Sequence, residues 1–241
     1  MFWDTYEPYH YIRNASYQGE EILIVGGYDH KTGDDDETAS YQQLEHYIKT
    51  HFTIKEIIFR WSAMFFEPAD GLPYIGKSPF KAHTYIATGY SGDGLLFSQV
   101  AARVLADQIQ GIENPYSKLY SPSRINISAS WKDFMKENLS VAKHLIVDRF
   151  KNEAEYPEEI RKGEGKIMRL EGKLTAVYRD ETGHFHRLSP VCAHMKCIVS
   201  WNNAEKTWDC PCHGARYSPM GEVLEGPATQ GLEQQGVFER G

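Results

Sequence analysis

The sequence has few cysteines, no excess of basic residues and no long apolar run. Its 241 residues hold four cysteines, and 26 Lys and Arg against 33 Asp and Glu give a net charge of −7. A nucleic-acid partner would require a basic stripe. No stretch approaches the roughly 18 apolar residues of a membrane span, and Met1–Asp4 lacks the basic start and apolar core of a secretion signal. We therefore expect a cytoplasmic protein with no membrane span and no nucleic-acid partner.

A dinucleotide-binding fingerprint is also missing. The apolar run Ile22–Val25 ends in Gly26 and Gly27, but G-x-G-x-x-G is absent, so these residues predict a strand and a turn. Composition is otherwise that of a soluble globular protein, with 41% apolar and 24% charged residues. The length allows one large or two ordinary domains.

The four cysteines are concentrated in two short boxes. The first reads C-A-H-M-K-C, from Cys192 to Cys197, and the second reads C-P-C-H-G, beginning at Cys210. Thiolates hold iron–sulfur clusters or zinc, and imidazoles suit zinc and iron. One cysteine and one histidine from each loop is the ligand pattern of a Rieske [2Fe–2S] centre. Cys192 and Cys210 would then bind one iron, and His194 and His213 the other.

A structural zinc site is the alternative for these boxes, although zinc sites usually pair their cysteines as C-x-x-C. The boxes CAHMKC and CPCHGARY resemble the Rieske iron–sulfur domain of the disulfide-containing type, over about residues 160–230. Gly226–Ala228 resembles the proline loop that covers the cluster in that family. If both loops meet at one cluster, the sulfurs of Cys197 and Cys212 also meet, and the resemblance implies a disulfide between them.

One position departs from the high-potential members of that family. They carry a hydroxyl residue where this chain has Ala215, whereas Tyr217, whose hydroxyl bonds a cysteine sulfur in the family, is retained. A lost hydrogen bond to sulfur lowers the reduction potential. We therefore expect a potential below that of respiratory Rieske proteins and above that of a four-cysteine ferredoxin.

The first half of the chain alternates predicted strands and helices. Helical spacing of apolar residues predicts a helix at about 40–52 with Ser40 as its N-cap. Ile57–Trp61 and Tyr85–Thr88 are predicted strands. Gly89–Gly94 then leads into a long helix, which ends at Gly111. The apolar stripe of that helix is Leu96, Val100, Val104, Leu105 and Ile109.

A second resemblance covers about residues 55–112. D-G-L-P-Y-I-G (Asp70–Gly76) and A-T-G-Y-S-G-D-G-L-L (Ala87–Leu96) resemble the C-terminal part of FAD-dependent oxidoreductases of the D-amino-acid oxidase and glycine oxidase superfamily. A glycine turn before a helix N-terminus suits an electron-rich group, and the resemblance implies that Gly92, Asp93, Gly94 and Leu95 face the flavin. The alternative is a plain strand-to-helix turn with a helix cap.

Two departures shape what this resemblance implies. The family's N-terminal Rossmann unit is not in this sequence, so we expect the back half of a longer enzyme whose partner is the missing FAD-binding half. Relatives that act on amino acids carry an arginine five residues before the aspartate of D-G-x-P. This chain has Phe65 there, which argues against an amino-acid substrate.

The second half of the chain changes character. A helix is predicted from Ser130 to Phe150, and Pro157 breaks a charged boundary segment. Short strands follow, as in an all-β domain, and His184 and His186 are predicted to be surface histidines. The tail after Thr229 is expected to fray. The predicted strands are 167–170, 174–178, 184–188, 198–201, 207–210 and 223–224.

The predicted fold class is therefore α+β, the C-terminal part of a flavoenzyme domain followed by an all-β Rieske domain. We expect a flavoenzyme segment at 1–115, a helical linker at 116–158, a Rieske domain at 159–234 and a tail at 235–241. The predicted function is that of an oxidoreductase fragment with a small-molecule substrate, FAD in the intact enzyme, and a [2Fe–2S] cluster that passes single electrons to a partner protein. A non-enzymatic electron carrier and a zinc-stabilised interaction module are the alternatives.

Overall fold

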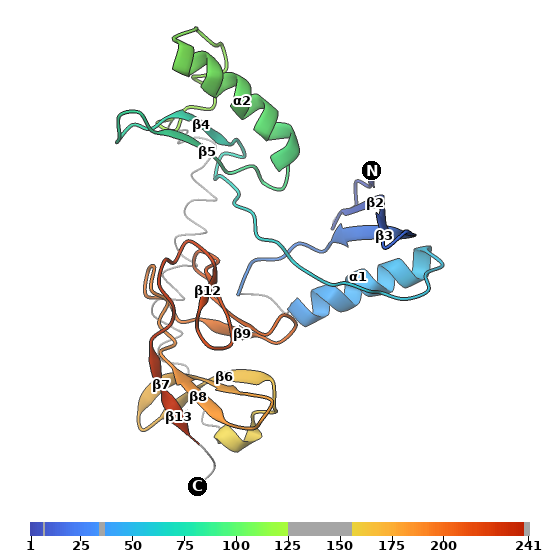
Figure 1. Ribbon diagram of the computed structural model, residues 1–241, viewed down its shortest axis with the longest axis vertical. Helices are drawn as coiled ribbons and strands as arrows, with labels where there is room; N and C mark the ends of the chain where they lie inside the picture. Colours follow the sequence, from blue (N-terminus) through green and yellow to red (C-terminus); the bar gives the residue numbers. More distant parts are fainter. Residues whose placement is uncertain (7, 34–36, 125–155, 239–241) are drawn as a thin grey trace. The chain divides into compact units, whose positions relative to one another are not determined.

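The computed structural model describes residues 1–6, 8–33, 37–124 and 156–238, which form both helices and strands (Figure 1). The predicted α+β class is confirmed. The elements are β1 (Phe2–Trp3), β2 (His10–Tyr17), β3 (Glu20–Gly27), α1 (Glu37–His51), β4 (Tyr74–Lys77), β5 (Tyr85–Thr88), α2 (Gly94–Gln110), η2 (Pro157–Glu159), β6 (Glu164–Leu170), β7 (Lys173–Arg179), β8 (Phe185–Leu188), β9 (Ser200–Asn202), β10 (Thr207–Asp209), β11 (Arg216–Tyr217), β12 (Val223–Glu225) and β13 (Gln234–Phe238).

The chain divides into two compact units. The first joins Met1–Trp61 to Val141–Gly241, and the second is Ser62–Ser140. The N-terminal residues thus share a unit with the cysteine boxes, although they lie far away in the sequence. The domain boundaries expected from the sequence remain a prediction.

In the N-terminal part of the first unit, β1, β2 and β3 form an antiparallel sheet. The sequence predicted β3 but not β2, whose mixed polarity hides the strand. Helix α1 begins at Glu37, so the prediction of Ser40 as N-cap is wrong. Glu37 in the first turn suits the positive end of the helix dipole. Ile57–Trp61, a predicted strand, is irregular and has no paired neighbour among the described residues.

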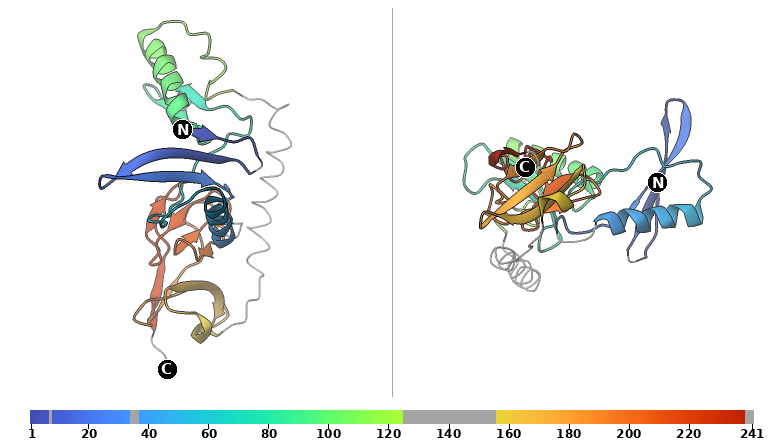
Figure 2. Two further views of the ribbon diagram at one scale, coloured as in Figure 1. Left: turned by 90° about the vertical axis from the view of Figure 1, so that its right-hand side faces the viewer. Right: turned by 90° about the horizontal axis from the view of Figure 1, so that it is seen from below.

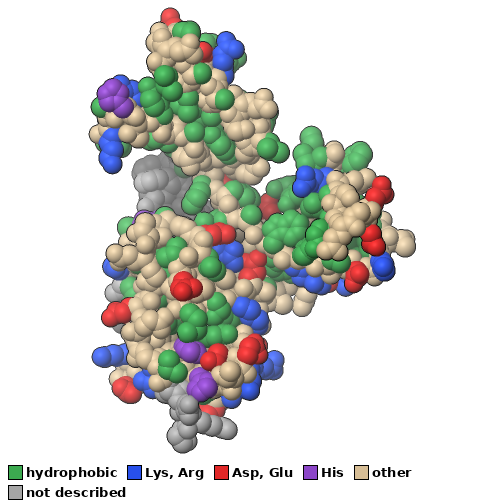
Figure 3. Space-filling model, in the orientation of Figure 1, with side chains coloured by type: hydrophobic (Ala, Val, Ile, Leu, Met, Phe, Trp, Pro, Cys, Tyr) green, Lys and Arg blue, Asp and Glu red, His purple; other side chains and the backbone are tan. Residues whose placement is uncertain are grey.

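Large hydrophobic side chains remain exposed on this N-terminal part, whose visible face in Figure 3 is rich in green atoms. They come from β1, from the segment that follows β1 and from the irregular segment after α1. Soluble proteins seldom expose many such side chains together unless the surface contacts something. The exposed aromatic residues among them include Phe2, Trp3, Tyr6, Phe59 and Trp61.

The second unit packs helix α2 against the hairpin β4–β5. Ala101 and Val104 of α2 bury against Ile75 of β4. The predicted apolar stripe of α2 is correct only in part, because Leu96 and Ile109 are exposed. Arg124 pairs with Asp70 at 2.7 Å and donates to the carbonyl of Pro73, which fixes the D-G-L-P loop. No local sequence pattern predicts this pairing.

Gly111 ends α2 as predicted, in the left-handed conformation with φ 71°. We expect Gly111→Ala to destabilise the second unit by about 1 kcal/mol, since only glycine adopts this conformation without a steric cost. No other atom lies within 4 Å of the added methyl group, so backbone strain is the whole effect. Urea unfolding of the full chain measures it. Gln110→Ala, one residue earlier within the helix, is the control and should change stability by less than about 0.5 kcal/mol; equal stability of the two variants would contradict the prediction.

Residues 156–238 fold into two four-stranded antiparallel sheets, drawn in yellow, orange and red in Figure 2. Their orders are β12-β11-β10-β9 and β13-β8-β7-β6. The main core joins the two sheets: Trp208 and Tyr217 of the first are fully buried with Ala176 and Leu188 of the second. The β-rich second half is therefore confirmed.

The C-terminal tail is more ordered than expected. Residues 234–238 form β13, which pairs with β8, so the prediction of a frayed tail after Thr229 is wrong. The segment is polar, and its order comes from backbone pairing with a strand that precedes it by some forty-five residues, which local composition does not reveal.

The helix predicted from Ser130 to Phe150 and the acidic residues 34–36 lie outside the described residues. No described helix combines the length and apolar character needed to cross a bilayer.

Candidate metal centre

Two loops of similar build carry the cysteine boxes. In the first, the Cys192 amide donates to the carbonyl of Cys197 at 2.8 Å. In the second, the Cys210 amide donates to the carbonyl of Ala215 at 2.8 Å. Each loop turns back with a residue at positive φ, Lys196 at 63° and Gly214 at 73°. Backbone hydrogen bonds thus fix both loops before any ligand is considered.

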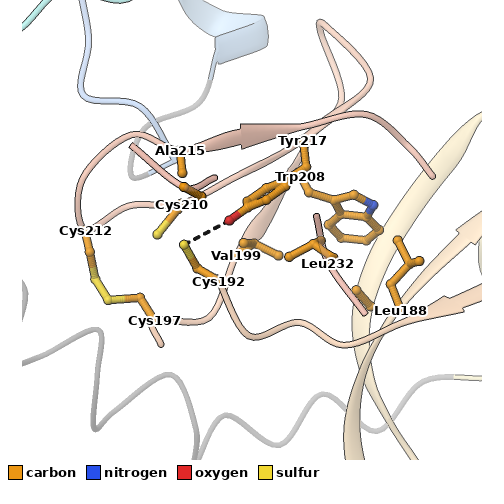
Figure 4. Close-up of a cluster of buried hydrophobic side chains, with 12 residues drawn as sticks. Leu188, Cys192, Cys197, Val199, Trp208, Cys210, Cys212, Ala215, Tyr217 and Leu232 are labelled. Carbon is orange, nitrogen blue, oxygen red and sulfur yellow. Dashed lines mark hydrogen bonds between the residues drawn. A yellow bond between two sulfur atoms is a disulfide. The ribbon is translucent and has the colours of Figure 1, made fainter. Parts of the chain in front are cut away.

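The loops bring all four cysteines together. Figure 4 shows the sulfurs of Cys192 and Cys210 pointing toward one another, while Cys197 and Cys212 are joined by a disulfide. This disulfide, with 6.5 Å between the Cα atoms, fastens one loop to the other. Cys210 also lies within reach of Cys197 and Cys212, the three sulfurs being within 4.8 Å of one another. Because disulfide sulfurs do not act as thiolate ligands, Cys192 and Cys210 are the cysteines left to bind metal.

The two free thiols interact strongly with each other. A hydrogen bond from the Cys210 thiol lowers the pKa of Cys192, and the Tyr217 hydroxyl adds a second hydrogen bond to its sulfur at 3.1 Å. The same pairing, together with burial, raises the pKa of Cys210. Two thiols that share a proton in this way favour an electropositive group between them, since a metal ion displaces thiol protons.

The two histidines lie side by side at the surface. The ring centroids of His194 and His213 are 4.9 Å apart, and both residues are exposed. Partial burial and the neighbouring His194 lower the pKa of His213, which favours the neutral imidazole that binds metal. The centre therefore has an inner side with two thiols and an outer side with two imidazoles.

These donors fit a [2Fe–2S] cluster of the Rieske type. Two buried cysteines and two exposed histidines, one of each from each loop, form the required set. Ala215, Val199 and Leu232 belong to the same buried cluster as the cysteines. The structure thus brings together all four residues that the sequence predicted as ligands. Their role as ligands and their assignment to the two irons remain predictions.

A buried ionic network behind the second loop had no sequence signal. Arg216, which stands between Ala215 and Tyr217 in the sequence, is buried, and its Nε lies 3.3 Å from Oδ1 of buried Asp209. Its Nη2 also contacts Glu205. The three residues come from β10, β11 and the turn before β10, so only the folded sheet reveals the cluster of charges.

The residues predicted to face a flavin lie at the N-terminus of α2. Asp93 is the N-cap residue and its side chain makes no capping hydrogen bond, while Gly92 has φ 84° with no other atom near its missing side chain. Leu95 is 89% exposed. The turn and the helix start are therefore as predicted, and the role of Gly92, Asp93, Gly94 and Leu95 in binding flavin remains a prediction.

His184 and His186, predicted as surface histidines, differ from each other. His186 is largely buried and its Nε2 lies 2.7 Å from Oδ2 of Asp180, whereas the side chain of His184 is 42% exposed. The prediction is therefore wrong for His186. The His186–Asp180 pair stabilises the β7–β8 turn, because Asp180 also accepts hydrogen bonds from the amides of Gly183 and His184.

Two family models match the chain. The model described as Rieske [2Fe-2S] domain matches residues 151–235, and the model described as FAD dependent oxidoreductase matches residues 1–108. Each match falls on one of the two resemblances seen in the sequence.

Named relatives agree with these matches. A protein of Bacillus subtilis (strain 168) named as a Rieske 2Fe-2S iron-sulfur protein, YhfW, is 36% identical over 236 residues, which are 97% of this chain and 46% of the relative. The cytochrome b6-f complex iron-sulfur subunit of Chlorobaculum thiosulfatiphilum is 38% identical over 77 residues, 32% of this chain and 41% of the relative. The chain thus spans less than half the length of each of these curated relatives.

Among solved structures, the plasma membrane Rieske protein PetC3 from Synechocystis PCC 6803 matches with a TM-score of 0.26 and 32% identity. The match covers 30% of this chain and 70% of that one.

Proposed function

We propose that this chain, which joins a segment of the FAD-dependent oxidoreductase family to a Rieske [2Fe–2S] domain, passes single electrons between a flavin and an external partner. The observation that carries the proposal is the convergence of Cys192, Cys210, His194 and His213 at one place in a domain of this family. The Rieske domain implies a [2Fe–2S] cluster, and the oxidoreductase segment implies FAD.

The protein's own groups prepare the centre for electron transfer. When bound, flavin exchanges electron pairs with organic molecules and a Rieske cluster exchanges single electrons, so the fusion connects the two kinds of chemistry. Cys192 and Cys210 would hold one iron, and the Tyr217 hydroxyl donates a hydrogen bond toward the Cys192 sulfur. The Cys197–Cys212 disulfide keeps the two loops at a constant separation.

The histidines would hold the second iron at the protein surface. Because His194 and His213 are exposed, a partner could approach this side of the centre more closely than the buried cysteine side. An exposed imidazole can also exchange a proton with water at the ring nitrogen that does not bind metal. We therefore place contact with the electron-transfer partner at the two histidines.

The exposed aromatic side chains of the N-terminal part support a second partner. Phe2, Trp3, Phe59 and Trp61 offer apolar surface without a covering segment among the described residues. The relative from Bacillus subtilis is about twice as long as this chain. We propose that an N-terminal FAD-binding half covers part of this surface and that the substrate, a small molecule, is oxidised there. Phe65 in place of arginine argues that it is not an amino acid.

A non-enzymatic electron carrier is the second candidate. The observation in its favour is the exposure of the predicted flavin turn, where Leu95 is 89% exposed and a methyl group added at Gly92 would meet no described atom within 4 Å beyond its chain neighbours. In such a protein the Rieske domain would work alone, and the oxidoreductase segment would be a structural remnant.

An anaerobic reductive titration of the purified chain separates the two candidates. A bound flavin consumes two electrons and a cluster one, so a chain that holds both groups should take up about three electrons and lose flavin absorbance. Uptake of a single electron without flavin absorbance would favour the carrier. Addition of FAD before the titration tests whether this chain binds flavin by itself.

A further inference from the structure

The second cysteine loop touches a segment far away in the sequence. Gly33 follows the N-terminal sheet, and a methyl group added at Gly33 would lie 2.9 Å from the amide nitrogen of Pro211 and 3.1 Å from the carbonyl carbon of Cys210. The φ of Gly33 is 76°, a conformation that suits glycine. Glycine is therefore required here for two reasons, the backbone conformation and the close approach of the loop that carries Cys210.

Two hydrogen bonds join the same parts of the chain. The Ser200 hydroxyl, at the start of β9, donates to the carbonyl of Gly33 at 2.9 Å. The Tyr41 hydroxyl, in α1, donates to Oε1 of Glu205 at 2.8 Å. These partners are more than 160 residues apart in the sequence, so the contacts are tertiary and not a consequence of local chain geometry.

The buried ionic network connects the Tyr41–Glu205 hydrogen bond to the second cysteine loop. Glu205, which accepts from Tyr41, also contacts Nη2 of Arg216, and Arg216 contacts Asp209 directly before Cys210. Ser200 lies opposite Asp209 in the β9–β10 pair. Both hydrogen bonds therefore end on residues that shape the second loop.

We propose that Gly33 and Tyr41 form a docking site for the second cluster-binding loop, so that the Rieske domain works while held against the N-terminal segment of its own chain. The occupant is the loop Cys210–His213 with Ser200 and Glu205 beside it. The exposed side chains of His194 and His213 remain open to an external partner in this docked state. The proposal relies on the proposed function only for the statement that this loop binds a cluster.

Hydrogen–deuterium exchange of the full chain tests the docking with a matched pair of variants. Gly33 and Gly19 both have positive φ, 76° and 84°, but no atom lies within 4 Å of a methyl group at Gly19. Ala at either position therefore strains the backbone alike, and only Gly33→Ala collides with the second loop. We expect exchange in peptides covering 200–217 to be about tenfold faster in Gly33→Ala than in Gly19→Ala, the effect of losing one or two hydrogen bonds of ordinary strength.

A milder variant guards against misfolding. Tyr41→Phe removes the hydrogen bond to Glu205 without adding an atom, and it should accelerate exchange in the same peptides and in those covering 28–45. Exchange in these peptides equal to that of Gly19→Ala, in both variants, would overturn the docking site. Iron and sulfide content, measured separately, tests the cluster itself, so a protein with no cluster and a protein with no docking give different results.

Discussion

Cys210→Ala and His194→Ala variants of the 241-residue chain are expected to purify with no bound [2Fe–2S] cluster. Cys210 is buried with its sulfur directed at Cys192, and the other free thiol, that of Cys192, is itself a predicted ligand and cannot replace it. His194 lies beside His213 at the outer side of the centre. Since each iron requires both of its protein ligands, the loss of either residue should reduce iron and acid-labile sulfide to background in the purified protein.

His184→Ala is the matched control for the histidine variant. His184 is partly exposed and lies in the same half of the chain, in the turn before β8, where it contacts Asp180. It should retain full iron and sulfide content. Far-UV circular dichroism of each variant shows whether the fold persists. A folded Cys210→Ala protein with a full complement of iron and sulfide would exclude Cys210 as a ligand.

Tyr217→Phe and Ala215→Ser are expected to move the reduction potential in opposite directions. The Tyr217 hydroxyl lies 3.1 Å from the Cys192 sulfur and is fully buried. Removing this hydrogen bond destabilises the reduced, more negative state, so the potential of Tyr217→Phe should fall. Ala215 is buried between the second loop and Tyr217, where a serine hydroxyl would add a donor, so the potential of Ala215→Ser should rise.

The size of each shift follows from hydrogen-bond energies. A hydrogen bond to a charged group contributes about 1.5–3 kcal/mol, and a tenfold change in a one-electron equilibrium is about 59 mV. Each variant should therefore shift by roughly 60–130 mV. Redox titration followed by visible absorbance measures the potentials. Tyr178→Phe, a partly buried tyrosine of β7 packed against Trp201, is the control and should leave the potential unchanged. A rise in the potential of Tyr217→Phe would contradict the role of its hydroxyl.

The candidate metal centre could be predicted from the sequence because residue type and spacing alone indicate its chemistry. Cys192, His194, Cys210 and His213 lie in two short boxes, and each loop needs only local backbone turns at Lys196 and Gly214 to present them. Helix α2 and its C-terminal glycine could also be predicted, because the helical spacing of apolar residues and Gly111 are local features of the sequence.

The elements that the sequence did not reveal depend on distant partners. Strand β13 is polar and forms because β8 offers a free edge, while the predicted strand Ile57–Trp61 lacks such a neighbour in the described part of the chain. Arg124 and Arg216 carry no sequence pattern, and each gains its role only when folding brings carboxylates around it. The contact of Gly33 with the second loop belongs to the same class, because no local rule relates residues so far apart.

EPR spectroscopy of the dithionite-reduced full chain, combined with iron, zinc and acid-labile sulfide analysis, is the most direct test of the proposed centre. A [2Fe–2S] cluster bound by Cys192, Cys210, His194 and His213 should give a rhombic signal with the low average g value of mixed histidine and cysteine ligation, together with equal amounts of iron and sulfide. Freshly purified protein that contains zinc without iron or sulfide would contradict it, and the cysteine loops would then form a structural zinc site.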